Sequence, residues 1–115
     1  MYAVIFEVEP NPGRQQDYLD LAARLKPELE KIDGFISVER FQSLTTEGKV
    51  VSLSFWRDAA AIERWRQHAD HAAAQRAGRT SFFRDYRISV AEVRRQYGLT
   101  DRKEAPQRPP EATRS

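Results

Sequence analysis

The segment WRDAAAIERWRQHADHAAAQRAGR, residues 56–79, predicts one amphipathic helix that follows directly on a strand. It carries Trp65 and both histidines of the protein, His68 and His71. At about 100° per residue, Trp65 shares a stripe with two alanines, while both histidines and Gln75 lie on the neighbouring stripe. An indole and two imidazoles are therefore predicted to meet at the border between the buried face of this helix and the solvent.

Four strands are predicted around this helix. Residues 2–9 alternate in character with the period of two that is typical of a strand. Residues 35–44 and 49–57 are predicted to form a hairpin whose loop ends in Gly48. The last strand is predicted over residues 85–95, so the chain has enough strands for a four-stranded sheet.

An earlier amphipathic helix is predicted over residues 15–32, because its apolar residues recur three and four positions apart. Pro27 is expected to kink this helix and Gly34 to end it. Asp58 is the expected N-cap of the helix that carries Trp65. The resulting order, βαββαβ, is typical of a ferredoxin-like α+β fold, in which both helices cover one face of an antiparallel sheet.

Apolar side chains occupy both faces of the predicted strands. Ile5 and Phe6 point to opposite faces, and so do Phe55 and Trp56. A sheet with one solvated face should alternate more cleanly, so we predict a symmetric homodimer that packs sheet against sheet. The alternative is that long side chains and the C-terminal tail shield the second face within one chain.

The 115 residues are predicted to form one domain over residues 1–98, followed by a polar, flexible tail over residues 99–115. The chain has no cysteine, which excludes disulfides, thiolate metal sites and cysteine nucleophiles. A net charge of +2, with basic and acidic residues interleaved, argues against nucleic-acid binding. Neither a long apolar run nor a signal peptide is recognisable, which predicts a cytoplasmic protein that does not span a membrane.

Five segments resemble the antibiotic biosynthesis monooxygenase (ABM) family of dimeric ferredoxin-like proteins. They are YAVIFEVEP, DGFISVERF, SLSFWRD, WRQHADHAAAQRAGR and DYRISVAEV, and the resemblance covers about residues 1–98. It implies a dimeric α+β barrel with oxidoreductase activity. The family includes cofactor-free oxygenases of aromatic polyketides, quinol oxygenases and haem-degrading enzymes.

Haem-degrading members of this family carry an asparagine on the first strand, a helix tryptophan and an iron-ligating histidine. Trp65 matches the tryptophan. Phe6 or Glu7 stands where the asparagine is expected, and Gln75 stands near the expected histidine. The resemblance therefore argues against haem degradation.

Polyketide-oxidising members carry tryptophan, tyrosine and arginine around the pocket, with an asparagine four residues before the tryptophan. Trp65 matches again, Ala61 replaces the asparagine, and His71 stands where the tyrosine is expected. Either Arg84 or Arg87 is the candidate arginine. Because the two point to opposite sides of a regular strand, at most one of them is expected to line the pocket.

The predicted function is cofactor-independent oxidation of a small phenolic or quinol-like aromatic compound by O2. This reaction needs a base that works near neutral pH, a cation or donor beside the substrate anion, and a dry pocket. His71 is the first candidate base, with Gln75 one turn further on as its partner, and His68 is the second. Trp65 is the candidate pocket wall, and a core tryptophan and surface histidines are the structural alternatives.

Phe82 and Phe83 are further candidates for the substrate-binding wall, although core packing explains them equally well. Two other functions stay open: a non-catalytic dimeric module that binds a small hydrophobic ligand or haem, and a haem-degrading monooxygenase. The preferred function needs no cofactor. His68 and His71 have the spacing of two metal ligands, but no third histidine or cysteine remains, so no metal site is predicted.

Overall fold

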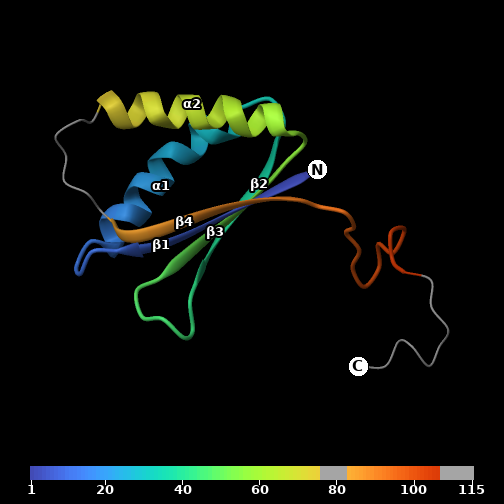
Figure 1. Cartoon of the computed structure of the whole chain (residues 1–115), viewed down its shortest axis with the longest axis horizontal. Coiled ribbons are helices and arrows are strands. Elements are labelled where there is room, and N and C mark those ends of the chain that lie inside the picture. The colour runs from blue at the N-terminus through green and yellow to red at the C-terminus, as the bar shows by residue number, and fades with distance from the viewer. Residues whose placement is uncertain (76–82, 107–115) are drawn as a thin grey trace.

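The computed structural model describes residues 1–75 and 83–106, and for residues 70–75 the backbone only. Its elements follow the predicted order βαββαβ, as Figure 1 shows. Their bounds are β1 (Tyr2–Pro10), α1 (Gln15–Glu30), β2 (Phe35–Gln42), β3 (Val50–Trp56), α2 (Ala59–Gln75) and β4 (Phe83–Glu92).

The four strands form one sheet in the order β2-β3-β1-β4, and every neighbouring pair is antiparallel. Both helices lie on the same side of this sheet (Figure 1). The predicted ferredoxin-like α+β fold is therefore confirmed. The last strand was predicted to begin at Asp85, whereas β4 begins at Phe83, opposite Pro10 of β1, because the register shifts between Glu9 and Pro10.

The junction between β3 and α2 has the predicted cap. The backbone N–H of Ala61 donates to the Oδ1 of Asp58 over 2.8 Å, and this bond, together with the Arg57 guanidinium, lowers the pKa of the Asp58 carboxyl. Gly34 adopts a φ of +97°, and a Cβ built on it would lie 2.6 Å from the Cβ of Ala61. Glycine at this position therefore lets the loop after α1 pass closely against the first turn of α2.

The strand register separates two faces of the sheet. One, the helix-facing side, carries Val8 and Trp56, which are fully buried beneath the helices. The other, the helix-free face, carries Ile5 paired with Leu53, and Glu7 paired with Val51. Apolar residues therefore occur on both faces, as the alternation in the sequence predicted.

The core on the helix-facing side divides into two clusters. The first cluster lies toward the start of α1, and the second toward its end and the start of α2. The buried members are Val8, Tyr18 and Val50 in the first cluster, and Leu29, Trp56 and Ala61 in the second.

After β4 the chain leaves the sheet and runs away from the body of the domain (Figure 1). The backbone N–H of Val93 still donates to the carbonyl of Met1 over 2.9 Å. Further along, the guanidinium of Arg102 lies 5.5 Å from the ring centroid of Tyr97, and Leu99 is almost fully exposed. Neither of the two described helices is long and apolar enough to cross a membrane.

Candidate active site

Glu28 of α1 and His68 of α2 join the two helices next to Trp65. The Nε2 of His68 lies 2.9 Å from the Oε1 of Glu28. The imidazole also stacks on the indole of Trp65, with ring centroids 5.5 Å apart and an interplanar angle of 26°. The predicted meeting of an indole with an imidazole is confirmed for His68, and we call this group the Glu28–His68–Trp65 site.

The pairing of His68 with a carboxylate assigns different roles to its two ring nitrogens. A neutral imidazole has one N–H donor and one acceptor nitrogen. In a neutral imidazole that donates from Nε2 to the Glu28 carboxylate, Nδ1 is the acceptor nitrogen. Both side chains are 41% exposed, so the pair contributes little to stability but holds the ring in one orientation.

Trp65 connects this site to the sheet. It is half-buried and packs against the second cluster. Val4 of β1 and Val38 of β2 pack against the same cluster from the helix-facing side. The Glu28–His68–Trp65 site therefore lies where the helix layer meets the sheet, with water on one side and apolar side chains on the other.

Four aromatic rings form a second group on the helix-facing side. Their centroids lie 5.7–6.4 Å apart in edge-to-face contacts. The rings are Phe6, Tyr18, Phe83 and Tyr86, and we call them the aromatic group. Phe83 was predicted as a wall residue, and the structure places it in this group.

The aromatic group continues into an exposed apolar strip on β4. Tyr86, Ile88 and Val90 are 58%, 55% and 56% exposed. In the register they lie opposite Val8, Phe6 and Val4, so they belong to the helix-facing side. The described part of the helix layer thus leaves the β4 edge of this side open, and an apolar molecule could lie against it.

Arg40 and Tyr18 form a pair that the sequence analysis missed. Arg40 lies on β2 opposite Ser52, which places it on the helix-facing side beside the hydroxyl of Tyr18. Burial raises the pKa of the Tyr18 phenol, and the neighbouring guanidinium of Arg40 opposes this in part. The sequence did contain one sign of this pair. Arg40 is two positions from Val38 on the same strand and therefore lies on the same face, where a charged residue is unusual.

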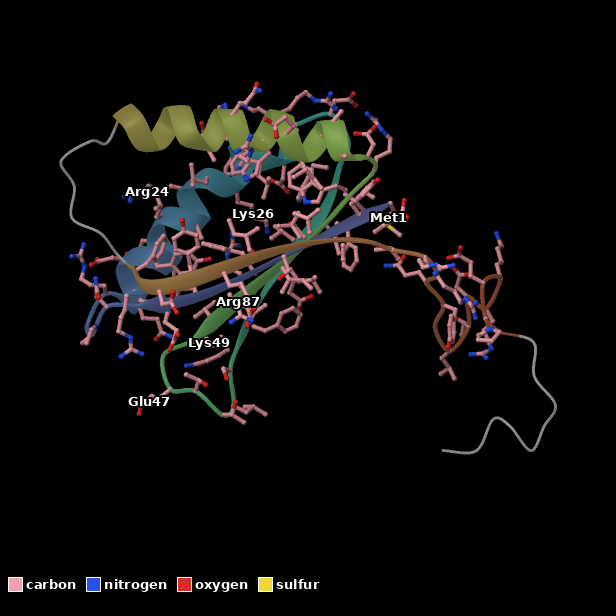
Figure 2. The ribbon with its side chains drawn as sticks, viewed as in Figure 1. Met1, Arg24, Lys26, Glu47, Lys49 and Arg87 are labelled. Carbon is pink, nitrogen blue, oxygen red and sulfur yellow. The ribbon has the colours of Figure 1, made fainter. Side chains whose placement is uncertain are left out.

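Arg84 and Arg87 both lie on β4, and the expectation that one of them lines the substrate pocket stays a prediction. The Nη2 of Arg84 pairs with the Oε1 of Glu9 over 3.0 Å. Arg87 lies opposite Glu7 in the register and therefore on the helix-free face. Figure 2 shows Arg87 on the side of the sheet away from the helices. The register between β1 and β4 shifts between Glu9 and Pro10, next to Arg84.

Three predicted residues lie outside what the structure describes. His71 and Gln75 belong to α2, but their side chains are outside the described residues. Phe82 is outside them altogether. The roles assigned to these three residues stay predictions. Among the residues that are described, no group of three or more histidines, cysteines, aspartates and glutamates could hold a metal ion.

Comparison with known proteins agrees with this architecture. The family model for antibiotic biosynthesis monooxygenase matches residues 1–77. The jasmonate monooxygenase ABM of Pyricularia oryzae (strain 70-15) is 47% identical over 93 residues, which cover 81% of this chain and 43% of that relative. This chain therefore spans less than half the length of that relative. The uncharacterized protein YqjZ of Bacillus subtilis (strain 168) is 33% identical over 95 residues, which cover 83% of this chain and 81% of the relative.

Solved structures share the fold at low sequence identity. The heme-degrader MhuD from Mycobacterium tuberculosis, with two hemes in its active site, has a TM-score of 0.66 at 18% identity, covering 85% of this chain and 100% of MhuD. A mutant of SnoaB, a cofactor-independent oxygenase from Streptomyces nogalater, has a TM-score of 0.65 at 16% identity, covering 83% and 94%. The family match covers most of the domain and confirms the family that the sequence motifs resemble. The chain belongs to the antibiotic biosynthesis monooxygenase family.

Proposed function

We propose that this chain is a cofactor-independent monooxygenase of a small phenolic or quinol-like compound, and that the Glu28–His68–Trp65 site is its reaction site. The observation that carries the proposal is the imidazole held between a carboxylate and an indole at the border of the core. Membership of a monooxygenase family and a 47% identical relative named as a monooxygenase support it.

A phenol with a free para position supplies the electrons that this reaction needs. Loss of the phenol proton gives an electron-rich anion, which can pass an electron to O2. Bond formation then places one oxygen atom on the para carbon. The second oxygen atom leaves as water, with the hydrogen of that carbon and the phenol proton, and the ring becomes a quinone. No external reductant is required, because the substrate itself is oxidised.

In this scheme His68 accepts the phenol proton at Nδ1, since Nε2 is held by Glu28. The carboxylate lies beside the positive charge that forms on the ring, and it keeps the ring in one tautomer. Trp65 excludes water from one side of the imidazole and offers a flat surface on which an aromatic substrate can stack.

Haem coordination would compete with the proposed role of His68. Coordination through Nε2 would displace Glu28, and coordination through Nδ1 would occupy the nitrogen that accepts the phenol proton. No step of the proposed reaction therefore uses haem. MhuD is a haem-degrading protein of the same fold, but at 18% identity it supports the fold alone.

We also propose that two copies pack through their helix-free faces, as the sequence predicted. The face carries Ile5, Leu53 and Phe55, all partly exposed in the single chain. Phe41 at its edge is 46% exposed. A second copy of the same face would cover these side chains and remove them from water.

Oxygen uptake with a panel of phenols and hydroquinones tests the proposed activity. We expect uptake by the unmodified protein in EDTA, and loss of most of it in His68→Ala. Gln67→Ala is the matched control, because Gln67 is an exposed neighbour on α2. His71→Ala, measured in parallel, tests the other predicted base.

Three results would contradict the proposal: full uptake in His68→Ala, uptake that EDTA abolishes, or no uptake with any compound of the panel. Binding of the same compounds without uptake would instead indicate a ligand-binding module. Hemin can be added to the unmodified protein and to His71→Ala. A shift in hemin absorbance with the first protein but not with the second would favour a haem function.

A further inference from the structure

A polar seam separates the two core clusters on the helix-facing side. It consists of Arg40 on β2 together with Ser52 and Ser54 on β3. Both serines are buried, at 9% and 8% exposure. The hydroxyl of Ser54 is occupied, because the indole N–H of Trp56 donates to it over 2.8 Å. Ser52 and Ser54 lie on an inner strand beneath the helices, where side chains are normally apolar, and Arg40 lies beside them on the edge strand β2.

The guanidinium of Arg40 is incompletely satisfied. Its Nε is buried, and no hydrogen-bond partner for it exists in the described part of the chain. Leaving a buried donor of a charged group without an acceptor is energetically unfavourable, because the donor has lost its hydrogen bonds to water. An ordered water or an external acceptor can satisfy such a donor, and an external acceptor would make it a binding group.

Nearby carboxylates are not positioned to serve Arg40. By register, Glu39 pairs with Leu53 and Glu7 with Val51, so both belong to the helix-free face. On α1 the carboxylate of Asp17 pairs with Arg14, and that of Glu28 with His68. Among the residues that the structure describes, no carboxylate therefore forms an ion pair with Arg40.

The neighbours of Arg40 define the chemistry of that group. A guanidinium presents donors in a planar fork that matches a carboxylate. The Tyr18 hydroxyl lies beside the guanidinium, and burial raises the pKa of this phenol, so it stays a neutral hydrogen-bond donor at physiological pH. Ser52, opposite Arg40 in the register, adds a second hydroxyl.

Apolar groups lie next to this polar end. Phe6 pairs with Ser52 on one side and with Ile88 on the other, so Arg40, Ser52, Phe6 and Ile88 form one row across the sheet. Neighbouring rows on one face lie about 7 Å apart along the strands. The next row contains Val4 and Val38, which pack against the same cluster as Trp65. A molecule of one ring and a short chain spans this distance.

We propose that Arg40, with the hydroxyls of Tyr18 and Ser52, binds the carboxylate of an organic acid substrate whose apolar body lies along Phe6 toward Trp65. This inference rests on the proposed function, because it narrows the phenolic substrate of the same site to compounds that also carry a carboxylate. It adds specificity residues on β2 and α1 that are remote in sequence from His68.

Isothermal titration of the full chain tests this inference with three probes: phenylacetate, 3-phenylpropionate and 4-phenylbutyrate, each compared with its neutral primary amide. We expect at least one carboxylate to bind about tenfold to a hundredfold more tightly than its amide, the range for a charge-assisted hydrogen bond. Arg40→Met should abolish this preference while leaving the affinity for the amide unchanged. Tyr18→Phe should reduce the preference in part.

Arg24→Met is the matched control, because it removes the same charge from an exposed position of α1 (Figure 2). It should bind all probes as the unmodified protein does. Circular dichroism and thermal melting confirm that each variant is folded. Arg40→Lys, which keeps the charge and loses the fork, should recover only part of the preference.

The inference is overturned if no carboxylate binds better than its amide, or if Arg40→Met keeps the preference. These outcomes are separable from the fate of the proposed activity. If carboxylates bind in a way that depends on Arg40 but no oxygen is taken up, the proposed activity is refuted and the carboxylate site at Arg40 is upheld. If oxygen uptake depends on His68 but not on Arg40 or on the charge of the substrate, the carboxylate site is refuted and the activity is upheld.

Discussion

Glu28 and His68 are 40 positions apart in the sequence, and their side chains meet with Oε1 and Nε2 2.9 Å apart. The contact joins the last turns of α1 to the middle of α2. Stacking on Trp65 alone would let the imidazole ring of His68 turn within its own plane, and the contact with Glu28 prevents this. The contact thus combines an interhelical link with control over which nitrogen of the imidazole is basic.

Replacing Glu28 with glutamine isolates the charge from the shape of this contact. The amide can still hydrogen-bond the ring, but it cannot stabilise the imidazolium. We expect kcat for phenol oxidation to fall by about tenfold to a hundredfold, with KM nearly unchanged. Glu30→Gln, at an exposed position on the same helix, is the control. An unchanged kcat in Glu28→Gln would remove Glu28 from the proposed mechanism.

Gly34→Ala should destabilise the domain by about 2–4 kcal/mol. The new Cβ would lie 2.6 Å from the Cβ of Ala61, on a backbone with φ of +97°. Gly48→Ala separates the two contributions, because Gly48 has a φ of +80° with nothing within 4 Å of its Cβ position. It should cost only about 1–2 kcal/mol, the conformational part. Urea unfolding measures both, and equal losses would mean that the close approach to Ala61 is unimportant.

The stability of the domain should fall at alkaline pH because of Tyr18. Burial raises the pKa of this phenol above its ordinary value of 10.0. Because the pKa is higher in the folded state, the neutral phenol contributes fully to the free energy of unfolding below pH 10. This contribution is lost as the pH rises through the folded-state pKa. In urea unfolding from about pH 8 to 11, the free energy of unfolding of Tyr18→Phe should fall less than that of the unmodified protein, because the variant has no phenol to ionise at position 18. An identical pH dependence in both proteins would contradict the assignment.

A charge in the centre of the helix-free face should prevent self-association. Leu53 pairs with Ile5 and Glu39 on that face, so an aspartate there would be buried without a partner in the proposed dimer. We expect light scattering to report a dimer for the unmodified protein and a monomer for Leu53→Asp. Leu44→Asp, in a fully exposed loop position, should remain dimeric. A monomeric unmodified protein would end the proposal.

The element order could be predicted from the chain because its signals are local. The alternation of residues 2–9 and the three-and-four spacing of residues 15–32 each arise within a few positions, and β1 and α1 follow them closely. Asp58 was recognisable as a cap for the same reason, since it bonds a backbone N–H only three positions away. The stack of Trp65 on His68 also follows from helical spacing alone.

The start of β4 and the pairing register at that end of the strand were not predictable in this way. The register shift between Glu9 and Pro10 is set by how β1 and β4 pair, and that pairing joins residues about 75 positions apart. Local alternation contains no information about such a shift.

Patterns along the chain thus determine which segments are helices and strands, which faces are apolar, and that Trp65 and His68 adjoin. Only the packing of α1 against α2 brings Glu28 to His68, and only the pairing of β2 with β3 places Arg40 beneath α1 near Tyr18. The physical reason is the distance along the chain between the residues that interact. Periodicity reflects the backbone geometry of neighbouring residues, whereas a carboxylate on one helix and an imidazole on another meet through contacts that form only when the whole sheet and both helices have assembled.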